Sequence, residues 1–309
     1  MSSSADLNEL RDLKSNIKDS LRTFAADSST TFSIVHTVAS ASPTNSTPSP
    51  SSPIPGLKTL YVLDSSFNPP TFAHLTLIQK ALANDKGARP CRVCLLLATE
   101  NADKKPKPAS FEDRLVLMSM MARSLRASLR DHDQEAEELA VDVAVTKKPF
   151  FMDKAQSIDD AGVYGGAQQV HVTGWDTIIR IFNSKYYPKD QKLRVLDPFL
   201  SKHRLRVCYR VGGDGSGGGD VSREEQEAYV EAVGDGSREE EGMKSEWRKM
   251  IELVDDAESV KGVSSTDSRK AAQEGRKEDL AKLVGERVAE YVISEKLYAE
   301  PGAVKKSYD

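Results

Sequence analysis

The residues best suited to chemistry follow an apolar segment that begins near position 60. Residues 60–63 are Leu-Tyr-Val-Leu, and after Asp64 comes the string Ser65-Ser66-Phe67-Asn68-Pro69-Pro70-Thr71-Phe72-Ala73-His74. This order predicts a buried strand, a short turn and a helix that starts close to His74. Thr71 and His74 are three positions apart, so both can face one phosphate oxygen. A histidine that donates to phosphate stabilises the charge that builds up during group transfer.

The place of this string at a strand-to-helix junction strengthens the prediction of a phosphate site. In an open α/β sheet, ligands bind beyond the carboxyl ends of the strands. Unpaired N–H groups at the start of a helix favour phosphate at the same place. A phosphate-bearing ligand is therefore expected at residues 65–74.

The elements that must position this string alternate along the chain. Predicted strands cover 57–65, 92–99, 139–146, 169–173, 205–211 and 247–255, and predicted helices cover 74–82, 111–125, 176–182, 265–274 and 280–297. Several strand segments are apolar throughout, which is typical of strands that are covered on both faces. The alternation predicts an α/β fold with a mainly parallel sheet.

Three further segments complete the predicted organisation. Residues 1–38 combine an amphipathic helix over 5–26 with a short strand, and we expect them to pack on the main body. Residues 39–56 are mostly Ser, Pro, Thr and Ala, a composition that predicts a flexible linker. The main domain covers 57–300 and contains a flexible Gly-rich and acidic insertion at about 212–245. Within this insertion, residues 222–232 are compatible with a helix.

Composition narrows the partners and the compartment. The 309 residues carry 43 Lys and Arg against 47 Asp and Glu, a net charge of -4, which argues against a nucleic-acid partner. There is no apolar run near the roughly 20 residues that a membrane span needs, nor a secretory signal, so no membrane partner is expected. The three cysteines lie on apolar, strand-like segments and do not suggest disulfides. These features predict a cytoplasmic or nuclear protein.

Four motifs together resemble a known family. The string 65–74 resembles the G-S-F-N-P-P-T-x-x-H signature of the nicotinamide mononucleotide (NMN) adenylyltransferases, within the nucleotidyltransferase superfamily marked by (H/T)-x-G-H. Gly174-Trp175-Asp176 before an apolar helix is similar to the family's G-x-D, and residues 264–269 (Ser-Ser-Thr-Asp-Ser-Arg) are similar to its S-S-T-x-x-R. A lysine-bearing loop at 101–110 precedes a helix that contains Arg114. The similarity is strongest to a fungal branch of the family and covers about 57–297, without 212–245.

The resemblance implies a fold and an activity. The fold would be Rossmann-like and doubly wound, of the nucleotidyltransferase type. The 5′-phosphate of NMN, or of nicotinate mononucleotide, would attack the α-phosphorus of ATP in line, giving NAD and pyrophosphate without a covalent enzyme intermediate. The protein would act by positioning and by charge stabilisation. Mg²⁺ would accompany ATP, because it bridges polyphosphate oxygens with few protein ligands.

The resemblance also implies roles for particular residues. The expected catalytic residues are Thr71, His74, Lys104 and Arg269, with Lys105 or Lys107 as alternates to Lys104. The expected ATP-binding residues are Ser66, Phe67, His74, Gly174, Asp176, Ser265, Thr266 and Arg269. The expected residues for NMN or NAD are Ser65, Ser66, Phe67, Asn68, Lys104, Trp175, Tyr187 and Arg210. Trp175 and Tyr187 are implied as stacking groups for a flat ring, and packing in the core is the alternative for both.

Three positions depart from the family pattern. Ser65 and Ala73 each stand where the family has glycine, and Ser268 stands where an apolar residue usually precedes the arginine. Two alternative functions therefore stay open on the same fold. One is an ATP hydrolase or another nucleotidyl transfer, and the other is a nucleotide-binding regulatory module with little turnover.

Overall fold

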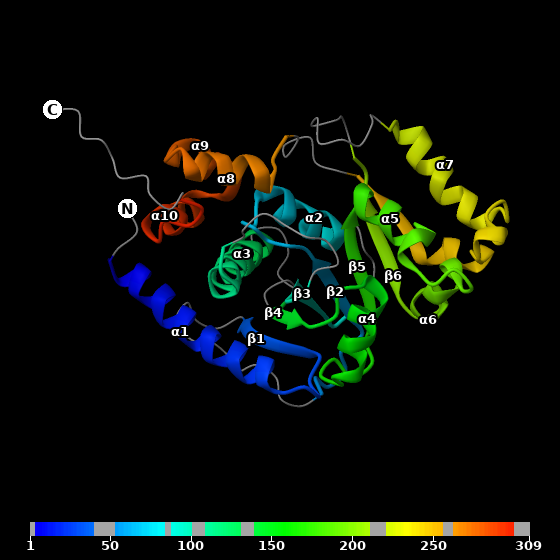
Figure 1. Ribbon diagram of the computed structural model, residues 1–309, viewed down its shortest axis with the longest axis horizontal. Coiled ribbons are helices and arrows are strands. Elements are labelled where there is room, and N and C mark those ends of the chain that lie inside the picture. The colour runs from blue at the N-terminus through cyan, green and yellow to red at the C-terminus, as the bar shows by residue number, and fades with distance from the viewer. Residues whose placement is uncertain are drawn as a thin grey trace.

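A seven-stranded sheet forms the centre of the fold in the computed structural model, which describes residues 4–39, 53–83, 88–100, 109–130, 139–210, 221–255 and 262–299 (Figure 1). The strands are β1 (Phe32–Val38), β2 (Thr59–Asp64), β3 (Cys91–Ala98), β4 (Val141–Thr146), β5 (Gln168–Gly174), β6 (Arg204–Cys208) and β7 (Ile251–Val254). Their order in the sheet is β1-β4-β3-β2-β5-β6-β7. All neighbours are parallel except β1 and β4, which are antiparallel. The predicted fold class is confirmed.

Helices cover both faces of this sheet. They are α1 (Ser4–Ala26), α2 (Phe72–Ala83), α3 (Phe111–Arg130), α4 (Phe151–Asp160), α5 (Trp175–Ile181), α6 (Asp197–Leu200), α7 (Arg223–Gly234), α8 (Ser265–Gln273), α9 (Lys277–Val284) and α10 (Glu286–Ser294). Helices α1–α3 and α8–α10 share one core cluster with the sheet, while α4–α7 contribute to two clusters on the other face. Helices α7 and α10 lie at opposite ends of the molecule (Figure 1).

Strand β2 shows why the apolar segments become strands covered on both faces. Tyr61 and Leu63 belong to the core cluster of α2 and α3, whereas Leu60 and Val62 belong to the cluster of α4. All four side chains are buried. Because successive side chains of a strand point to opposite faces, a continuous apolar run fills both cores at once.

The strand order creates a switch point that positions the site. The chain adds β3 and β4 on one side of β2, and then returns to add β5, β6 and β7 on the other side. Strands β2 and β5 are parallel neighbours, with Leu63 opposite Val172. Ser65, which follows β2, and Gly174, which ends β5, therefore lie at the same edge of the sheet. This is the place where open α/β sheets bind ligands.

Several segments differ from the sequence prediction. Helix α4 was not predicted. The single helix predicted over 280–297 is divided into α9 and α10 at Gly285, whose φ of 89° and ψ of 153° lie in a region that only glycine adopts readily. The strand predicted from 247 begins only at Ile251, because Trp247 lies in a 3₁₀ turn with its side chain fully buried.

The predicted insertion at 212–245 is folded in its second part. Ser222 begins α7 with a capping box that it shares with Glu225, and Val230 and Val233 of that helix are buried together with Trp247. The prediction of a flexible insertion is therefore wrong for residues 222–245, since their apolar residues complete a core cluster. Residues 211–220, and residues 40–52 of the predicted linker, lie outside the described residues.

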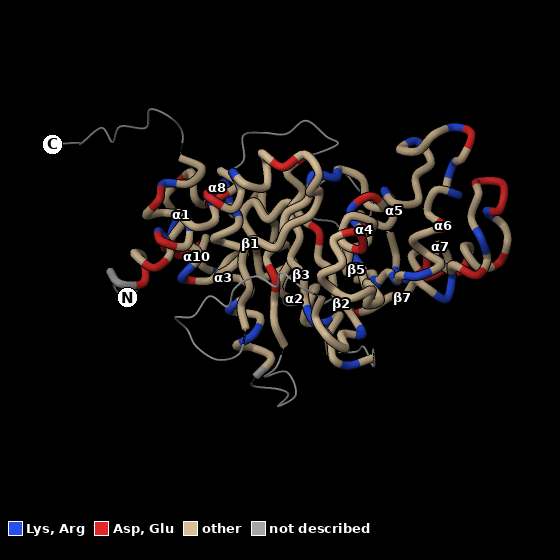
Figure 2. Tube along the Cα trace, turned by 90° about the horizontal axis from the view of Figure 1, so that it is seen from below, with Lys and Arg blue, Asp and Glu red and all other residues tan. Residues whose placement is uncertain are grey.

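The surface carries both signs of charge. Figure 2 shows Lys and Arg interspersed with Asp and Glu along the elements in that view. In the described parts of the chain, no helix combines the length and the apolar character needed to span a bilayer.

Candidate active site

His74 is held in one orientation by the start of its own helix. Its Nδ1 accepts a hydrogen bond from the backbone N–H of Thr71 at 3.1 Å, and the Thr71 hydroxyl lies 2.9 Å from the same atom. Burial lowers the pKa of His74 to about 4, so the ring is neutral at pH 7. Since Nδ1 accepts, the single ring proton sits on Nε2. Nε2 lies 2.9 Å from Ser65 Oγ, so the site presents His74 as a donor.

The turn between β2 and α2 has a constrained backbone. Phe67 has a φ of 43°, in the left-handed region that a bulky side chain rarely adopts. Its fully buried ring packs on the His74 ring with 5.2 Å between centroids. The carbonyl oxygen of Ser66 accepts from Arg114 of α3, from Nε at 2.8 Å and also from Nη2. Strained backbone of this kind concentrates at functional sites, where surrounding contacts hold it in place.

The start of α8 is attached to the same turn. Ser265 Oγ donates to the carbonyl oxygen of Pro69 at 2.8 Å, and Arg269 Nη1 donates to that of Asn68 at 2.7 Å. Arg269 Nη2 also donates to Thr266 Oγ1 at 3.1 Å. The structure thus brings two of the predicted motifs, whose contacting residues are 196 and 201 positions apart in sequence, into direct contact. Thr266 itself is exposed in the first turn of α8.

Asn68 has a structural role in the turn. Its Oδ1 accepts from the Tyr298 hydroxyl at 2.9 Å and from the Ala109 N–H at 3.2 Å. Its side chain is buried. The side-chain oxygen therefore ties the turn to the start of α3 and to the segment after α10. A contact of Asn68 with a nucleotide stays a prediction.

Gly174, Asp176 and Arg210 meet at the end of β5. Gly174 is the N-cap of α5, and a side chain built there would meet no atom within 4 Å. Arg210 Nη1 contacts Asp176 Oδ1 at 2.6 Å, with Asp176 largely exposed. The structure thus pairs two residues that the resemblance assigned to different substrates.

Trp175 and Tyr187 face the core. Trp175 is only 5% exposed and packs edge-on against Tyr229, with 5.4 Å between ring centroids. Tyr187 is partly buried against the same cluster, and its hydroxyl donates to the carbonyl oxygen of Ile181 at 2.7 Å. The ring of Trp175 therefore serves the packing of α5 on α7, which is the alternative to stacking. A stacking role for the partly buried Tyr187 stays a prediction.

An ion pair that the sequence did not reveal lies beside the turn. Lys154 of α4 contacts Asp64 at 2.5 Å between Nζ and Oδ2, and both side chains are more than four-fifths buried. Asp64 is the last residue of β2 and immediately precedes Ser65. The only signal for this element in the sequence was the spacing of Phe151, Ala155 and Ile158, which suits one helix face.

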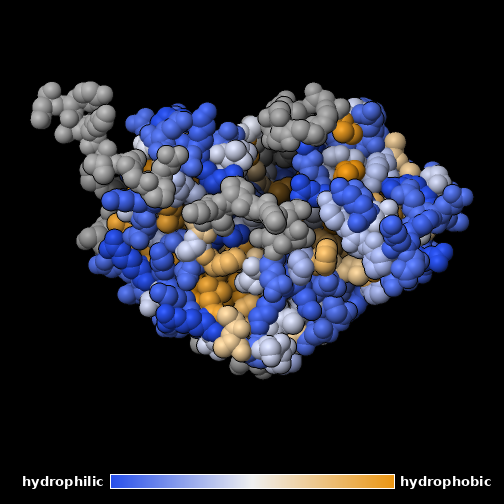
Figure 3. All heavy atoms as spheres, in the orientation of Figure 1, coloured by the Kyte–Doolittle hydropathy of each residue, from blue (hydrophilic) through white to orange (hydrophobic). Residues whose placement is uncertain are grey.

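Phe150 supplies an exposed aromatic ring at the same sheet edge. It is the N-cap of α4 after the end of β4, and its carbonyl oxygen accepts the N–H of Lys154. Figure 3 shows a mostly hydrophilic face with smaller apolar areas. Among the described residues, Phe150 (43% exposed) and Ile179 (36% exposed) are the most exposed large apolar side chains.

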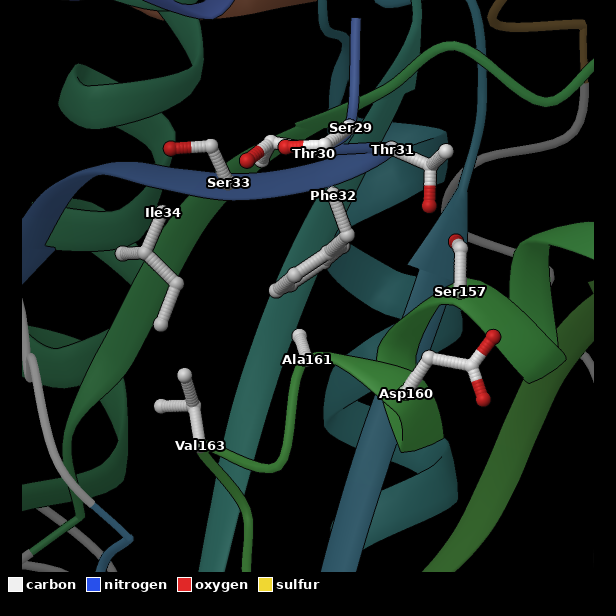
Figure 4. A pocket seen from close by; sticks show the side chains of 10 residues that line it. All are labelled: Ser29, Thr30, Thr31, Phe32, Ser33, Ile34, Ser157, Asp160, Ala161 and Val163. Atoms are coloured by element: carbon white, nitrogen blue, oxygen red, sulfur yellow. The ribbon is translucent and has the colours of Figure 1, made fainter. Parts of the chain in front are cut away.

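Two further features lie apart from the turn at residues 65–74. Lys104 and its alternates Lys105 and Lys107 lie outside the described residues. A pocket of about 320 Å³ lies between the start of β1 and α4, with Phe32, Ile34 and Ser157 among its lining residues (Figure 4). None of the predicted site residues lines that pocket, so it is separate from the candidate site.

The site and fold together define a class. A neutral histidine donor and the start of α8 share one strand-to-helix turn, at the switch point of a mainly parallel sheet. This arrangement is that of an α/β nucleotidyltransferase.

Comparison with known proteins supplies the family. A Schizosaccharomyces pombe protein provisionally named nicotinamide mononucleotide adenylyltransferase is 33% identical over 232 residues, which cover 75% of this chain and 82% of that protein. The chain belongs to the nicotinamide mononucleotide adenylyltransferase family. No family model matches the chain.

A solved structure agrees on the fold. The Plasmodium falciparum nicotinic acid mononucleotide adenylyltransferase complexed with NaAD has a TM-score of 0.50 and 14% identity, covering 78% of this chain and 97% of that chain. The same protein complexed with APC has a TM-score of 0.48, with the same identity and coverage. At this identity the likeness concerns the fold alone.

Proposed function

We propose that the chain transfers the adenylyl group of ATP to nicotinamide mononucleotide, or to its nicotinate counterpart, and releases pyrophosphate. Family membership supports the reaction class. The observation that carries the proposal is the hydrogen bonding of His74, which leaves an N–H donor and no free lone pair on the ring. Such a group stabilises developing negative charge on phosphate oxygens.

The chemistry of the acceptor fits a site without a base. The 5′-phosphate of a mononucleotide is ionised at neutral pH, so its oxygen attacks without losing a proton. One bond forms between this oxygen and the α-phosphorus, and the bond from that phosphorus to the pyrophosphate oxygen breaks. The protein has to align the two nucleotides and to stabilise charge on the equatorial oxygens.

The same geometry makes hydrolysis the weaker alternative. Water is a poor nucleophile, and a hydrolase that used His74 as its base would need an unprotonated ring nitrogen facing that water. Nδ1 of His74 accepts from the Thr71 N–H, and Nε2 carries the proton. His74 is therefore suited to donate and unsuited to accept.

The remaining groups are proposed to divide between the substrates. The start of α8, with Thr266, would hold the ATP phosphates, since exposed N–H groups and the helix dipole favour anions there. Asp176 would accept from a ribose hydroxyl, and Arg210 would orient that carboxylate. Lys104 stays a prediction for a phosphate contact, and a cytoplasmic or nuclear location stays a prediction as well.

Mg²⁺ is proposed to arrive with ATP. Within the described ranges, no three His, Cys, Asp or Glu side chains gather into a metal site. Mg²⁺ that is bound to ATP is held chiefly by phosphate oxygens and water, so it does not require a protein cluster of this kind. When bound, the ion would neutralise charge on the leaving pyrophosphate.

The test is a parallel measurement of both products. Pyrophosphate and NAD are followed from Mg-ATP with NMN, with nicotinate mononucleotide (deamido-NAD is the product then), and with neither acceptor. Equal amounts of dinucleotide and pyrophosphate that depend on an acceptor support the proposal. Phosphate release that is indifferent to acceptor would support a hydrolase, and nucleotide binding without turnover would support a regulatory module.

A further inference from the structure

Ser65 occupies the one donor position of His74. The Nε2–H of the neutral ring points at Ser65 Oγ, 2.9 Å away. Within the described residues, His74 is the hydrogen-bond partner of this hydroxyl. A substrate oxygen therefore cannot bond to Nε2 directly while Ser65 keeps this rotamer.

The backbone of Ser65 holds this hydroxyl in place. The Ser65 N–H donates to the carbonyl oxygen of Leu96 at 3.3 Å and so continues the ladder of β2 with β3. The side chain is half-buried, next to the constrained turn at Phe67. Since Oγ accepts from His74, its own proton is free to turn toward the ligand space. A hydroxyl that accepts one hydrogen bond becomes a stronger donor in the next.

We propose that Ser65 is a catalytic residue, whose hydroxyl donates to an oxygen of the reacting phosphates while His74 polarises that hydroxyl from behind. This rests on the proposed adenylyl transfer and changes which side chain meets the substrate. No proton is transferred in the step. The acceptor oxygen bonds to the α-phosphorus, pyrophosphate leaves with the electron pair of the broken bond, and the two hydrogen bonds shorten as charge develops.

The opposing arrangement is a hydroxyl that only obstructs. In that case Ser65 would rotate away when nucleotide binds, and His74 would contact phosphate itself. The two arrangements predict opposite results for removal of the hydroxyl. If the hydroxyl links His74 to the phosphate by two hydrogen bonds, an arrangement called the relay below, its removal lowers activity. If the hydroxyl only obstructs His74, its removal leaves activity unchanged or raises it.

The experiment is a double-mutant cycle on the full chain with Ser65→Ala, His74→Ala and the double variant, using kcat for dinucleotide formation. Loss of one charge-stabilising donor typically lowers kcat by ~10²-fold. We expect a loss of this size for Ser65→Ala, and the double variant should lie within about threefold of it, because His74 acts through Ser65. Ser65→Thr, which keeps a hydroxyl, should recover much of the rate. Ser33→Ala, a half-buried serine of β1 outside the site, is the matched control.

Two results would overturn the relay. One is a kcat for Ser65→Ala or Ser65→Gly at or above that of the unmodified chain. The other is a double variant whose loss is the product of the two single losses. Each variant of Ser65 and His74 is compared with the unmodified chain in thermal unfolding. This separates a folding defect from a catalytic one.

Binding of Mg-pyrophosphate distinguishes this inference from the proposed function. If the unmodified chain makes no dinucleotide with either acceptor, the adenylyl transfer fails, and calorimetric titration with Mg-pyrophosphate alone then decides the relay. Weaker binding by Ser65→Ala, with no further loss in the double variant, would support the contact. Binding unchanged by Ser65→Ala would reject it.

Discussion

The Arg114 guanidinium binds the carbonyl oxygen of Ser66 through Nε and Nη2 and thereby fixes the direction of the next peptide. In a trans peptide the carbonyl oxygen and the following N–H point to opposite sides. The N–H of Phe67 therefore faces away from α3, and it can serve a ligand. Burial lowers the pKa of Arg114 to about 10, so the group stays charged at neutral pH.

Replacing Arg114 should impair the site beyond its effect on stability. In Arg114→Met the half-buried Ser66 carbonyl loses its partner, which costs up to about 1–3 kcal/mol, the value for a fully buried acceptor, and the peptide is free to turn. We expect kcat/KM to fall by roughly 10-fold or more, since losing about 1.4 kcal/mol of transition-state stabilisation is tenfold in rate. Arg123→Met, on the same helix but paired with Glu9, is the control. If the steady-state rates of Arg114→Met equalled those of Arg123→Met, this role of Arg114 would be contradicted.

Trp175 and Phe150 should respond differently to substitution. Trp175→Ala removes a buried ring and should lower the free energy of unfolding by about 3–5 kcal/mol, so Trp175→Phe is the variant for kinetics and should leave the KM for the acceptor nearly unchanged. Phe150→Ala removes an exposed ring. If that ring stacks on a base or pyridinium, the KM should rise roughly 5- to 150-fold, from ~1–3 kcal/mol of stacking. A KM that responds to Trp175→Phe and not to Phe150→Ala would restore the original assignment.

The sequence predicted the parts of the fold that local pattern determines. The alternating apolar strands, the turn before α2 and the start of α8 at Ser265 all follow from spacing and capping residues. The break at Gly285 was missed, because a glycine within an apolar helical pattern does not reveal its φ. Helix α4 was missed because its short apolar pattern is interrupted by charged residues.

The contacts within the site could be predicted only in part. The resemblance brought the motifs at His74 and Arg269 together, but spacing gave no sign that Arg269 binds the turn itself. Asp64 and Lys154 are 90 positions apart, and only the crossing of α4 makes them neighbours. Trp175 lies in the core because α7 packs against it. The sequence pattern of α7 did not show where that helix packs, so both the core and a ligand contact stayed open for Trp175.

Stability should fall as the solution is acidified below pH 6.5. Burial lowers the pKa of His36 to about 4, of His74 to about 4 and of His171 to about 3. The unfolded chain, with histidine pKa values near 6.5, therefore binds more protons than the folded chain between pH 6.5 and 4. The free energy of unfolding should drop in this window by up to ~1.4 kcal/mol per pH unit for each histidine.

Urea unfolding at several pH values measures this slope. His171 lies between Phe151 and Phe199, and in His171→Gln one titrating group is gone, so the slope should be smaller by the share of one histidine. The absolute stability of this variant does not matter to the comparison. An unchanged slope would show that His171 does not titrate as its burial requires. Turnover should likewise show no acid limb near pH 6.5 from His74.

The pair of Asp64 and Lys154 should show a coupling that surface pairs lack. Lys154→Met leaves a largely buried carboxylate at the end of β2 without its cation, and Asp64→Asn leaves the cation, so each single change should cost about 1–3 kcal/mol. The double variant should be more stable than the sum of the single losses predicts, because no uncompensated charge remains. Asp279→Asn removes an exposed partner of Arg276 and should cost less than ~1 kcal/mol. Since Asp64 precedes Ser65, Lys154→Met should also lower kcat. If the losses in the free energy of unfolding were additive and kcat were unchanged, the pair would behave as an ordinary surface contact.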